Sequence, residues 1–255
     1  MGDKVCRVIH HDVTDPYLNL AFEEGILDAM RVDEKIPPTI RLWRNARSVI
    51  IGRFQSVGDE VDIDACEEFS VRIARRCSGG GAVYNDMGNL NWSLYLRPEA
   101  HAVSVEVKSL FQLVASSLAS NLAALGVPAS SASNSVYING GKVSGLAMYM
   151  KGGYRTLHGT LLVRSDLTIL NKVLKASNNQ NSRYTRSIRV PTINLSSALA
   201  EDISLDASAE ILKKAILEAI GARAEAGNLT KLEEELATGK LEVKHSQPNW
   251  IFSIP

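Results

Sequence analysis

The glycine-rich segment RRCSGGGAVYNDMGNLNWSLYL, residues 75–96, carries the side chains that could bind an anionic substrate. Ordering Gly79, Gly80 and Gly81 costs chain entropy, so the backbone here must bend unusually or approach a partner closely. Successive N–H groups in such a turn can converge on an anion, and the two preceding arginines could add a charged fork for phosphate or carboxylate. The segment matches neither the GxxxxGK[ST] loop nor a GxGxxG turn that opens a helix. The alternative interpretation is a tight strand connection with a bulge and solvated arginines.

Two further basic side chains lie in strand-like runs. Lys142 follows an Asn-Gly-Gly turn and shares its strand face with Ser144, so it either contacts an anion or is a solvated ammonium. His158 lies in the run LHGTLLV beside Gly159, which permits close backbone approach. It is either near the chemistry or a hydrogen-bonded core residue. No His, Cys, Asp or Glu cluster has a spacing typical of a metal site.

Helices are predicted at four places. DPYLNLAFEEGILDAM begins with Asp15 as a cap and Pro16 at the first position. VEVKSLFQLVASSLASNLAALG is a long amphipathic helix that ends at a glycine, and its apolar side is formed by Val107, Leu110, Val114, Leu118, Leu122 and Leu125. The tail contains ASAEILKKAILEAIG and TKLEEELA, and the second opens with Thr230 and Glu233 as a capping box.

The remaining elements read as strands: TIRLWRN, SVIIGRF, SVRIARR, NLNWSLYL, NSVYI, KVSGLAMYM and RTLHGTLLV. In NLNWSLYL one face consists of Leu90, Trp92, Leu94 and Leu96. Hairpins interrupted by long helices predict an α/β fold of the α+β kind, with mixed, largely antiparallel sheets flanked by helices. We expect one domain over residues 1–255, with a core of 1–200 and a helical C-terminal extension of 201–255. The polar segment 176–187 is predicted to be a mobile loop that closes over a substrate.

The overall composition excludes several classes of protein. Of the 255 residues 45% are hydrophobic and 22% are charged, which is typical of a globular protein. The 28 basic and 28 acidic residues cancel, so no net charge favours nucleic acid or an anionic membrane. Three cysteines without a paired pattern favour a reducing, cytoplasmic setting. Neither a signal peptide nor a membrane-spanning run is apparent.

The order of the motifs is more informative than any single one. The chain resembles the lipoate–protein ligase A family in three central motifs, which are, in order, RRCSGGGAVYNDMGNLNWS, KVSGLAM and HGTLL. The flanking segments DPYLNLAFEE, LWRNARSVIIGRFQ and SQPNWIF resemble that family as well. The resemblance covers nearly the whole chain. It implies the catalytic fold that lipoate ligases share with biotin ligases and class II tRNA synthetases. It also implies the use of ATP and Mg²⁺ to convert lipoate to lipoyl-adenylate, followed by transfer to a lysine of a lipoyl domain, either in E2 subunits or in the glycine-cleavage H protein.

The resemblance also implies roles for individual residues. Lys142 corresponds to the family lysine that contacts both the lipoyl carboxyl and the α-phosphate, and is the expected catalytic residue. The residues expected to bind nucleotide or lipoyl-adenylate are Arg76, Ser78, Gly79, Gly80, Gly81, Val83, Asn85, Asn89, Lys142 and His158. The residues expected to line the lipoyl pocket are Glu24, Trp43, Val83, Gly145 and Ala147. No residue is assigned to a metal.

Three departures from the family pattern have consequences. Asn85 stands where the family usually has His, and Asn cannot take up charge near neutral pH. Ser135 stands where an Asp is usual, which removes a carboxylate. The chain stops soon after Trp250, where longer bacterial ligases continue into an accessory domain. We therefore expect a catalytic subunit that needs a separate accessory subunit to form the adenylate.

Three other functions compete with this interpretation. An octanoyltransferase of the same superfamily needs a nucleophilic cysteine beyond the lysine hairpin, and no cysteine follows Cys77. A biotin ligase would carry a basic Gly-Arg-rich loop, which is absent. A non-catalytic protein that binds lipoate or a lipoyl domain remains open because of Asn85 and Ser135.

Overall fold

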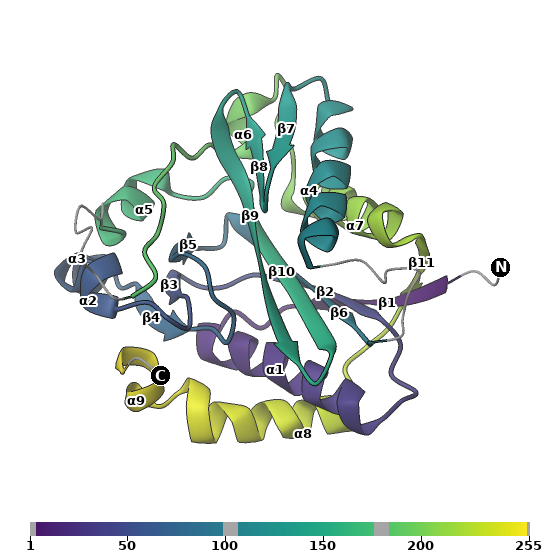
Figure 1. Cartoon of the computed structure of the whole chain (residues 1–255). Helices are drawn as coiled ribbons and strands as arrows, with labels where there is room; N and C mark the ends of the chain where they lie inside the picture. The colour runs from purple at the N-terminus through teal and green to yellow at the C-terminus, as the bar shows by residue number, and fades with distance from the viewer. Residues whose placement is uncertain (1–3, 99–106, 176–183, 254–255) are drawn as a thin grey trace.

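A computed structural model describes residues 4–98, 107–175 and 184–253 (Figure 1). The strands are Lys4–His11 (β1), Thr39–Trp43 (β2), Ser48–Ile51 (β3), Arg72–Arg75 (β4), Val83–Asn85 (β5), Asn89–Leu96 (β6), Ala129–Ala132 (β7), Ser135–Ile138 (β8), Gly141–Lys151 (β9), Tyr154–Leu162 (β10) and Ala222–Ala226 (β11). The helices are Pro16–Val32 (α1), Val57–Glu60 (α2), Ile63–Glu68 (α3), Val107–Ala123 (α4), Leu167–Val173 (α5), Leu195–Ala198 (α6), Leu205–Ile220 (α7), Lys231–Lys240 (α8) and Pro248–Phe252 (α9), with a π-helical turn at Leu241–His245 (η1).

Two sheets organise the chain. The large sheet has eight strands in the order β11-β1-β2-β6-β10-β9-β8-β7, and the small sheet has the order β4-β3-β5. In the large sheet β1 pairs in parallel with β11 and β2, and every other pair is antiparallel. In the small sheet β3 pairs in parallel with β4 and antiparallel with β5. The mixed, largely antiparallel α/β fold expected from the sequence is confirmed.

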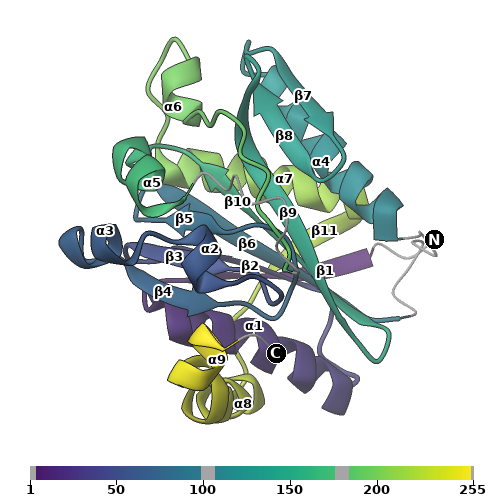
Figure 2. The same ribbon diagram turned by 60° about the vertical axis from the view of Figure 1, so that its left-hand side comes forward.

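Helices cover both faces of the large sheet. On one face, α4 and α7 pack on the apolar side of β6, and Leu94, Leu118 and Leu212 belong to one buried cluster there. On the other face lies α1, which packs in turn on α8 (Figure 1). The small sheet stands beside this second face, and α9 contacts β4 there (Figure 2). The space between the two sheets and α1 is where the site is built.

Most of the local signals in the sequence act as expected. The Asp15 carboxylate caps α1 by accepting from the Leu18 N–H at 2.9 Å, and the capping box of Thr230 and Glu233 opens α8. The β8–β9 and β9–β10 hairpins turn through residues with positive φ, including Gly140 and Gly153. These turns matter because the first one delivers Lys142.

Two expectations, on Leu125 and on the tail, need correction, and two further points were left open by the sequence. Leu125 was expected on the apolar side of the long helix, but α4 ends at Ala123 and Leu125 is 37% exposed. The run SVIIGRF does not pair with TIRLWRN, because β3 lies in the small sheet and β2 in the large one. The tail is not only helical: β11 extends the large sheet beside β1. Both arginines of the glycine segment are buried rather than solvated.

The predicted mobile loop, 176–187, falls mostly outside the described residues. Across the described parts of the chain, no helix has the length and apolar character needed to span a membrane.

Candidate active site

A cavity of about 530 Å³ opens between the large sheet, α1 and the glycine segment. Its floor is one register row of the large sheet, in which β2, β6, β10, β9 and β8 contribute Trp43, Asn91, Thr160, Gly145 and Ser135. Two positions further along, on the same face, His158 and Ala147 also line it. Because all these strands are paired, the floor is a fixed surface rather than a loop.

The glycine segment forms one wall of the cavity. Gly80 has φ +89°, a conformation that other residues rarely adopt, and Gly80 and Gly81 both line the cavity. Gly52 permits this fold of the chain, since a Cβ there would lie 2.2 Å from the Gly80 carbonyl oxygen. No hydrogen bond among the described residues uses the N–H groups of Gly79, Gly80 or Gly81. Their backbone donors therefore remain available to a ligand.

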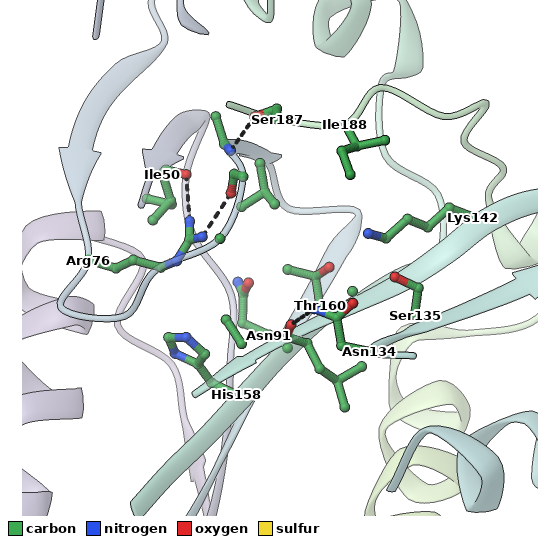
Figure 3. Close-up of a pocket in the computed structure, with 18 of the residues that line it drawn as sticks. Ile50, Arg76, Asn91, Asn134, Ser135, Lys142, His158, Thr160, Ser187 and Ile188 are labelled. Atoms are coloured by element: carbon green, nitrogen blue, oxygen red, sulfur yellow. Dashed lines mark hydrogen bonds between the residues drawn. The ribbon is translucent and has the colours of Figure 1, made fainter. Parts of the chain in front are cut away.

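Arg76 donates hydrogen bonds to the carbonyl groups of the glycine segment, whose amides have no hydrogen bond among the described residues. Its guanidinium donates to the carbonyl oxygens of Ile50, Gly79 and Gly81 at 3.0, 2.7 and 2.8 Å, and to Ser78 Oγ at 3.0 Å (Figure 3). The sequence suggested that this guanidinium binds an anion directly. In the structure it lines the cavity, and four of its five N–H donors hold backbone carbonyls and Ser78, so it also shapes the loop.

Arg75 is likewise structural. Its guanidinium donates to the carbonyl oxygens of Gly52, Arg53 and Gln55, and to those of Trp250 and Ile251 in α9. The Trp250 indole N–H donates back to the Arg75 carbonyl at 2.9 Å. The C-terminal motif SQPNWIF thus hydrogen-bonds to Arg75, at the end of the strand that leads into the glycine segment. Sequence reasoning found this motif but assigned it no physical role.

A buried polar chain joins α1 to the glycine segment through the floor. Glu23 Oε1 lies 2.7 Å from His158 Nδ1, and His158 Nε2 lies 2.7 Å from Ser78 Oγ. Ser93 also donates to Glu23. Burial opposes ionisation of Glu23, but His158, Ser93 and Arg41 outweigh it and hold its pKa below the usual value. Because the carboxylate stays charged, it fixes the imidazole, and the imidazole fixes the serine.

Lys142 reaches into the cavity from the side opposite Arg76 (Figure 3). Its backbone is held on both sides, since its N–H donates to the Pro191 carbonyl and its carbonyl accepts from Ile193. Its ammonium has no hydrogen bond or ion pair within the described parts of the chain. Burial, with a smaller contribution from Arg76, lowers the pKa of Lys142. A partly buried cation without an anion is the clearest sign that the cavity receives one.

Gly145 makes room for this lysine. A Cβ on Gly145 would lie 2.8 Å from Cε and 2.9 Å from Nζ of Lys142. The glycine predicted for the lipoyl pocket therefore has a physical reason to be a glycine. It lets the ammonium lie flat on the floor.

The segment that begins at residue 184 covers the glycine wall. Ser187 Oγ accepts from the Ala82 N–H at 2.8 Å and from Gln55 Nε2 at 3.1 Å, and Thr185 N–H donates to the Phe54 carbonyl. The described end of the predicted loop, residues 184–187, thus lies against the site.

The structure brings most of the predicted site residues together. The cavity is lined by Trp43, Arg76, Gly80, Gly81, Val83, Asn85, Lys142, Gly145, Ala147 and His158. Ser78, Gly79 and Asn89 lie one contact behind the lining: Ser78 and Gly79 hold Arg76 and His158, and Asn89 donates to Asn85 and Asn91.

Glu24, predicted for the lipoyl pocket, is not among the residues that line this cavity. The cavity is lined by Glu23 instead, and Glu24 faces the C-terminal helices. There its carboxylate binds Lys240 at 3.3 Å and Lys244 at 2.8 Å, and lies 3.2 Å from His245 Nε2. The helical period places consecutive residues about 100° apart, so a choice between adjacent glutamates needed the position of α8, which the sequence alone does not show.

Glu24, Cys77 and His245 are near enough to one another to hold a metal ion. The Lys244 ammonium, however, lies 2.8 Å from Glu24 Oε2 and 3.2 Å from Cys77 Sγ. Burial and Glu24 outweigh Lys244 and raise the pKa of the Cys77 thiol to about 12. In these contacts the cluster is a buried ion-pair network that joins α1 to the tail.

Sequence reasoning missed Asn91 and Thr160. Both are on the floor, and Asn91 is only 3% exposed. A signal for them was present: the face of β6 opposite Leu90 and Trp92 carries polar residues, yet β6 is buried along its whole length. A strand that is buried on both sides and polar on one is a sign of a polar cavity.

Comparison with known proteins identifies the family of the chain. The family model of the lipoyl protein ligase A/B catalytic domain matches residues 15–217. The chain belongs to this family. A Lipoate-protein ligase A subunit 1 from Thermoplasma acidophilum is 29% identical over 93% of this chain and 92% of the relative. Lipoate–protein ligase 1 of Staphylococcus aureus is 30% identical over 82% of this chain, which spans only 62% of that relative.

Solved structures of lipoate ligases superpose over nearly the whole chain. A bipartite lipoate–protein ligase from T. acidophilum, described with its E2 lipoyl domain, has a TM-score of 0.85 at 27% identity and covers 99% of this chain and 98% of that one. A T. acidophilum protein with bound lipoic acid scores 0.82 at 26% identity, covering 97% and 99%. A lipoate–protein ligase A bound with ATP scores 0.80 at 27% identity, covering 98% and 99%. The family resemblance drawn from the motifs is therefore confirmed.

Proposed function

We propose that this lipoate ligase catalytic chain activates lipoate with ATP to lipoyl-adenylate and then transfers the lipoyl group to a lysine of a lipoyl domain. The observation that carries the proposal is the pairing of unbonded donors across one cavity. The Lys142 ammonium stands on one side and the amides of the glycine wall stand on the other. Relatives with bound ATP and bound lipoic acid support both substrates.

Activation joins two anions. A carboxylate oxygen of lipoate attacks the α-phosphorus of ATP, and the bond from that phosphorus to the bridging oxygen breaks, so that pyrophosphate leaves. Like charges repel at this step, and a compact ammonium between them offsets the repulsion. Lys142 is placed for this role, and the amides of Gly80 and Gly81 would bind phosphate oxygens on the far wall.

The residues of the cavity fit Mg²⁺ only as an ion carried by the phosphates. Its lining, within the described residues, holds one carboxylate, Glu23, and His158 and Ser93 already engage it. Mg²⁺ commonly keeps several waters and binds through substrate phosphates. Asn134 and Ser135, which also line the cavity, could supply neutral oxygens. The ion would neutralise phosphate charge, while the protein groups orient the reacting oxygens.

Transfer needs the neutral amine of the acceptor lysine. The amine attacks the lipoyl carbonyl, an amide bond forms, and the bond to the AMP oxygen breaks. The same ammonium that assisted adenylation would stabilise charge on the carbonyl and on the departing phosphate. The acceptor we propose is a lipoyl domain of an E2 subunit or of the glycine-cleavage H protein, and a T. acidophilum relative was solved as a bipartite ligase with its E2 lipoyl domain.

We further propose that adenylation by this chain needs a separate accessory subunit. Support comes from the relative named subunit 1, of whose length this chain covers 92%, and from the T. acidophilum relative solved as a bipartite ligase. Alone, the chain would transfer a preformed lipoyl group from lipoyl-adenylate.

The cysteine positions argue against an ATP-independent acyltransferase. Cys6 and Cys66 are buried at 0% and 2% exposure, and none of the three thiols lines the cavity. Burial raises the pKa of Cys6 to about 12 and, together with Asp62, that of Cys66 to about 11. A nucleophilic thiolate would need the opposite shift.

Mass spectrometry of a purified E2 lipoyl domain tests the proposal. The domain is incubated with this chain and with lipoate plus ATP, or with synthetic lipoyl-adenylate. We expect a gain of one lipoyl mass from lipoyl-adenylate without any helper protein, and from ATP only when an accessory subunit is added. No gain under either condition would overturn the ligase proposal and favour a non-catalytic binding protein. A full gain from ATP alone would overturn the need for the accessory subunit.

A further inference from the structure

Three buried N–H donors in the cavity lining have no partner among the described residues: Asn91 Nδ2 and Trp43 Nε1 on the floor, and Trp92 Nε1. Asn91 Nδ2 and Trp43 Nε1 make no hydrogen bond with any described residue, although Asn91 is 3% and Trp43 is 6% exposed. Asn91 on β6 and Trp43 on β2 are direct partners across the two strands, and both line the cavity. A buried donor without an acceptor costs roughly 1–3 kcal/mol, so an unbonded pair in a binding cavity points to an acceptor that the ligand supplies.

The orientation of Asn91 is set by its neighbours. Asn89 Nδ2 donates to Asn91 Oδ1 at 3.0 Å and also to Asn85 Oδ1. With its oxygen held in this way, the Asn91 amide presents its nitrogen, and with it two donors, to other partners. The three asparagines therefore form a chain that orients the Asn91 amide.

The register of the sheet places these donors at a defined distance from Lys142. The ammonium lies over Gly145, which pairs with Thr160, and Thr160 pairs with Asn91. Adjacent strands are about 4.8 Å apart, so Asn91 lies roughly 10 Å across the floor from Gly145. Trp43 lies one strand further on.

This distance matches the length of lipoate. Its carboxyl carbon is joined to the dithiolane ring by five single bonds of about 1.5 Å, which span roughly 6 Å when extended. A carboxylate about 3 Å from the ammonium would therefore bring the ring to the row position of Asn91. The two ring sulfurs are weak hydrogen-bond acceptors, as thioether sulfur is. An octanoyl tail of similar length carries no acceptor at all.

We propose that Asn91, assisted by Trp43, is a specificity-determining residue that recognises the dithiolane sulfurs and so discriminates lipoate from purely hydrocarbon acids. This inference rests on the proposed function for the orientation of the substrate, with its carboxylate at Lys142. A site built to hydrogen-bond its substrate disfavours an analogue that leaves its buried donors unpaired. The apolar neighbours Leu20, Ile50 and Leu146 accommodate either tail and give no such discrimination.

The sharpest probe is 5-cyclopentylpentanoate, which keeps the ring shape of lipoate and lacks the sulfurs. Calorimetry on the purified chain gives the dissociation constants of lipoate, this analogue and octanoate for the wild type and for Asn91→Leu. We expect the wild type to prefer lipoate over the analogue about tenfold, and the variant to lose most of that preference without weaker binding of the analogue. Asn121→Leu, on α4 and outside the cavity lining, should keep the wild-type ratio.

Equal binding of lipoate and the analogue by the wild type overturns the inference, as does an unchanged ratio in Asn91→Leu. If that variant fails to fold, Asn91→Val supplies a second donor-free residue suited to a strand. Because binding is measured without ATP or acceptor, the outcome is separate from the proposed reaction. A tenfold preference in a chain that transfers no lipoyl group would support the inference and overturn the proposed function.

Discussion

The two walls of the cavity carry positive charge in opposite ways. On the glycine wall, Arg76 is 6% exposed and donates to three backbone carbonyls and one hydroxyl. On the lysine wall, Lys142 is held only by its backbone, and its ammonium bonds to no other described residue. The difference shows that the hydrogen-bond partners of a buried charged group, and not its burial alone, indicate whether the group holds the fold or binds a ligand. A guanidinium that gives four of its five N–H donors to the loop holds a shape, whereas an ammonium without a partner among the described residues can bind an anion.

The largest expected effect comes from Lys142→Ala. If the ammonium acts on the reacting anions, its removal should lower kcat for adenylation by about 10²–10³. The free energy of unfolding should not fall, because a desolvated charge without a partner is lost. Steady-state kinetics with the accessory subunit and thermal unfolding measure the two quantities. Lys231→Ala, at an 88% exposed side chain, serves as the control and should change neither; a Lys142 variant that loses stability instead of rate would break the comparison.

Arg76→Met should give the reverse profile. Carbonyls of Ile50 and the glycine wall would lose their donors, so we expect a loss of about 3 kcal/mol in the free energy of unfolding, with activity falling as a consequence. Urea titration measures the loss. Arg72→Met changes an arginine on β4, the strand that ends just before Arg76. Its side chain is 42% exposed in a surface ion pair with Asp15, so the change should cost less than about 1 kcal/mol. Equal stability of the two variants contradicts the structural role of Arg76.

A smaller effect is expected from Gly145→Ala. The added Cβ would meet Lys142 Cε and Nζ at less than 3 Å, and the flexible side chain would give way. We expect kcat to fall about tenfold through displacement of the ammonium, with little change in stability. Gly239→Ala meets nothing within 4 Å and should leave kcat as it is. Wild-type kinetics in Gly145→Ala would show that the position of the ammonium on the floor is not critical.

The smallest effect concerns pH. Burial and Arg76 lower the pKa of Lys142, and the reaction uses the charged form, so the rate should fall as pH rises through that lowered value. In Lys142→Arg the charge persists to higher pH, and the alkaline fall of the surviving activity should move upward. Rate profiles of both proteins from neutral to alkaline pH test this. Profiles that coincide would assign the alkaline fall to another group.

Much of this architecture is readable in the sequence because its signals are local. The Asp15 cap, the Asn-Gly turn before Lys142 and the alternation in β6 each act within a few residues. Partners distant in sequence are not readable in this way. The residues near Arg76 in the sequence do not indicate that the Ile50 carbonyl accepts a hydrogen bond from it. Those near Glu24 do not indicate its ion pair with Lys244.

The same limit explains two features of the site that the sequence does not show. The carbonyl partners of Arg76 were not visible, because the direction of its guanidinium depends on β3. Asn91 was not predicted because the prediction for β6 considered only its apolar face, which packs in the core. Reading the polar face of a buried strand as a possible floor would have found it.

A crystal structure with a non-hydrolysable sulfamoyl analogue of lipoyl-adenylate tests the central claim most directly. We predict that the sulfamoyl oxygens lie within hydrogen-bond distance of Lys142 Nζ and of the Gly80 and Gly81 amides, while Arg76 stays on the carbonyls of Gly79 and Gly81. An Arg76 guanidinium that leaves those carbonyls to bind the sulfamoyl group, with Lys142 turned away from it, would contradict the account.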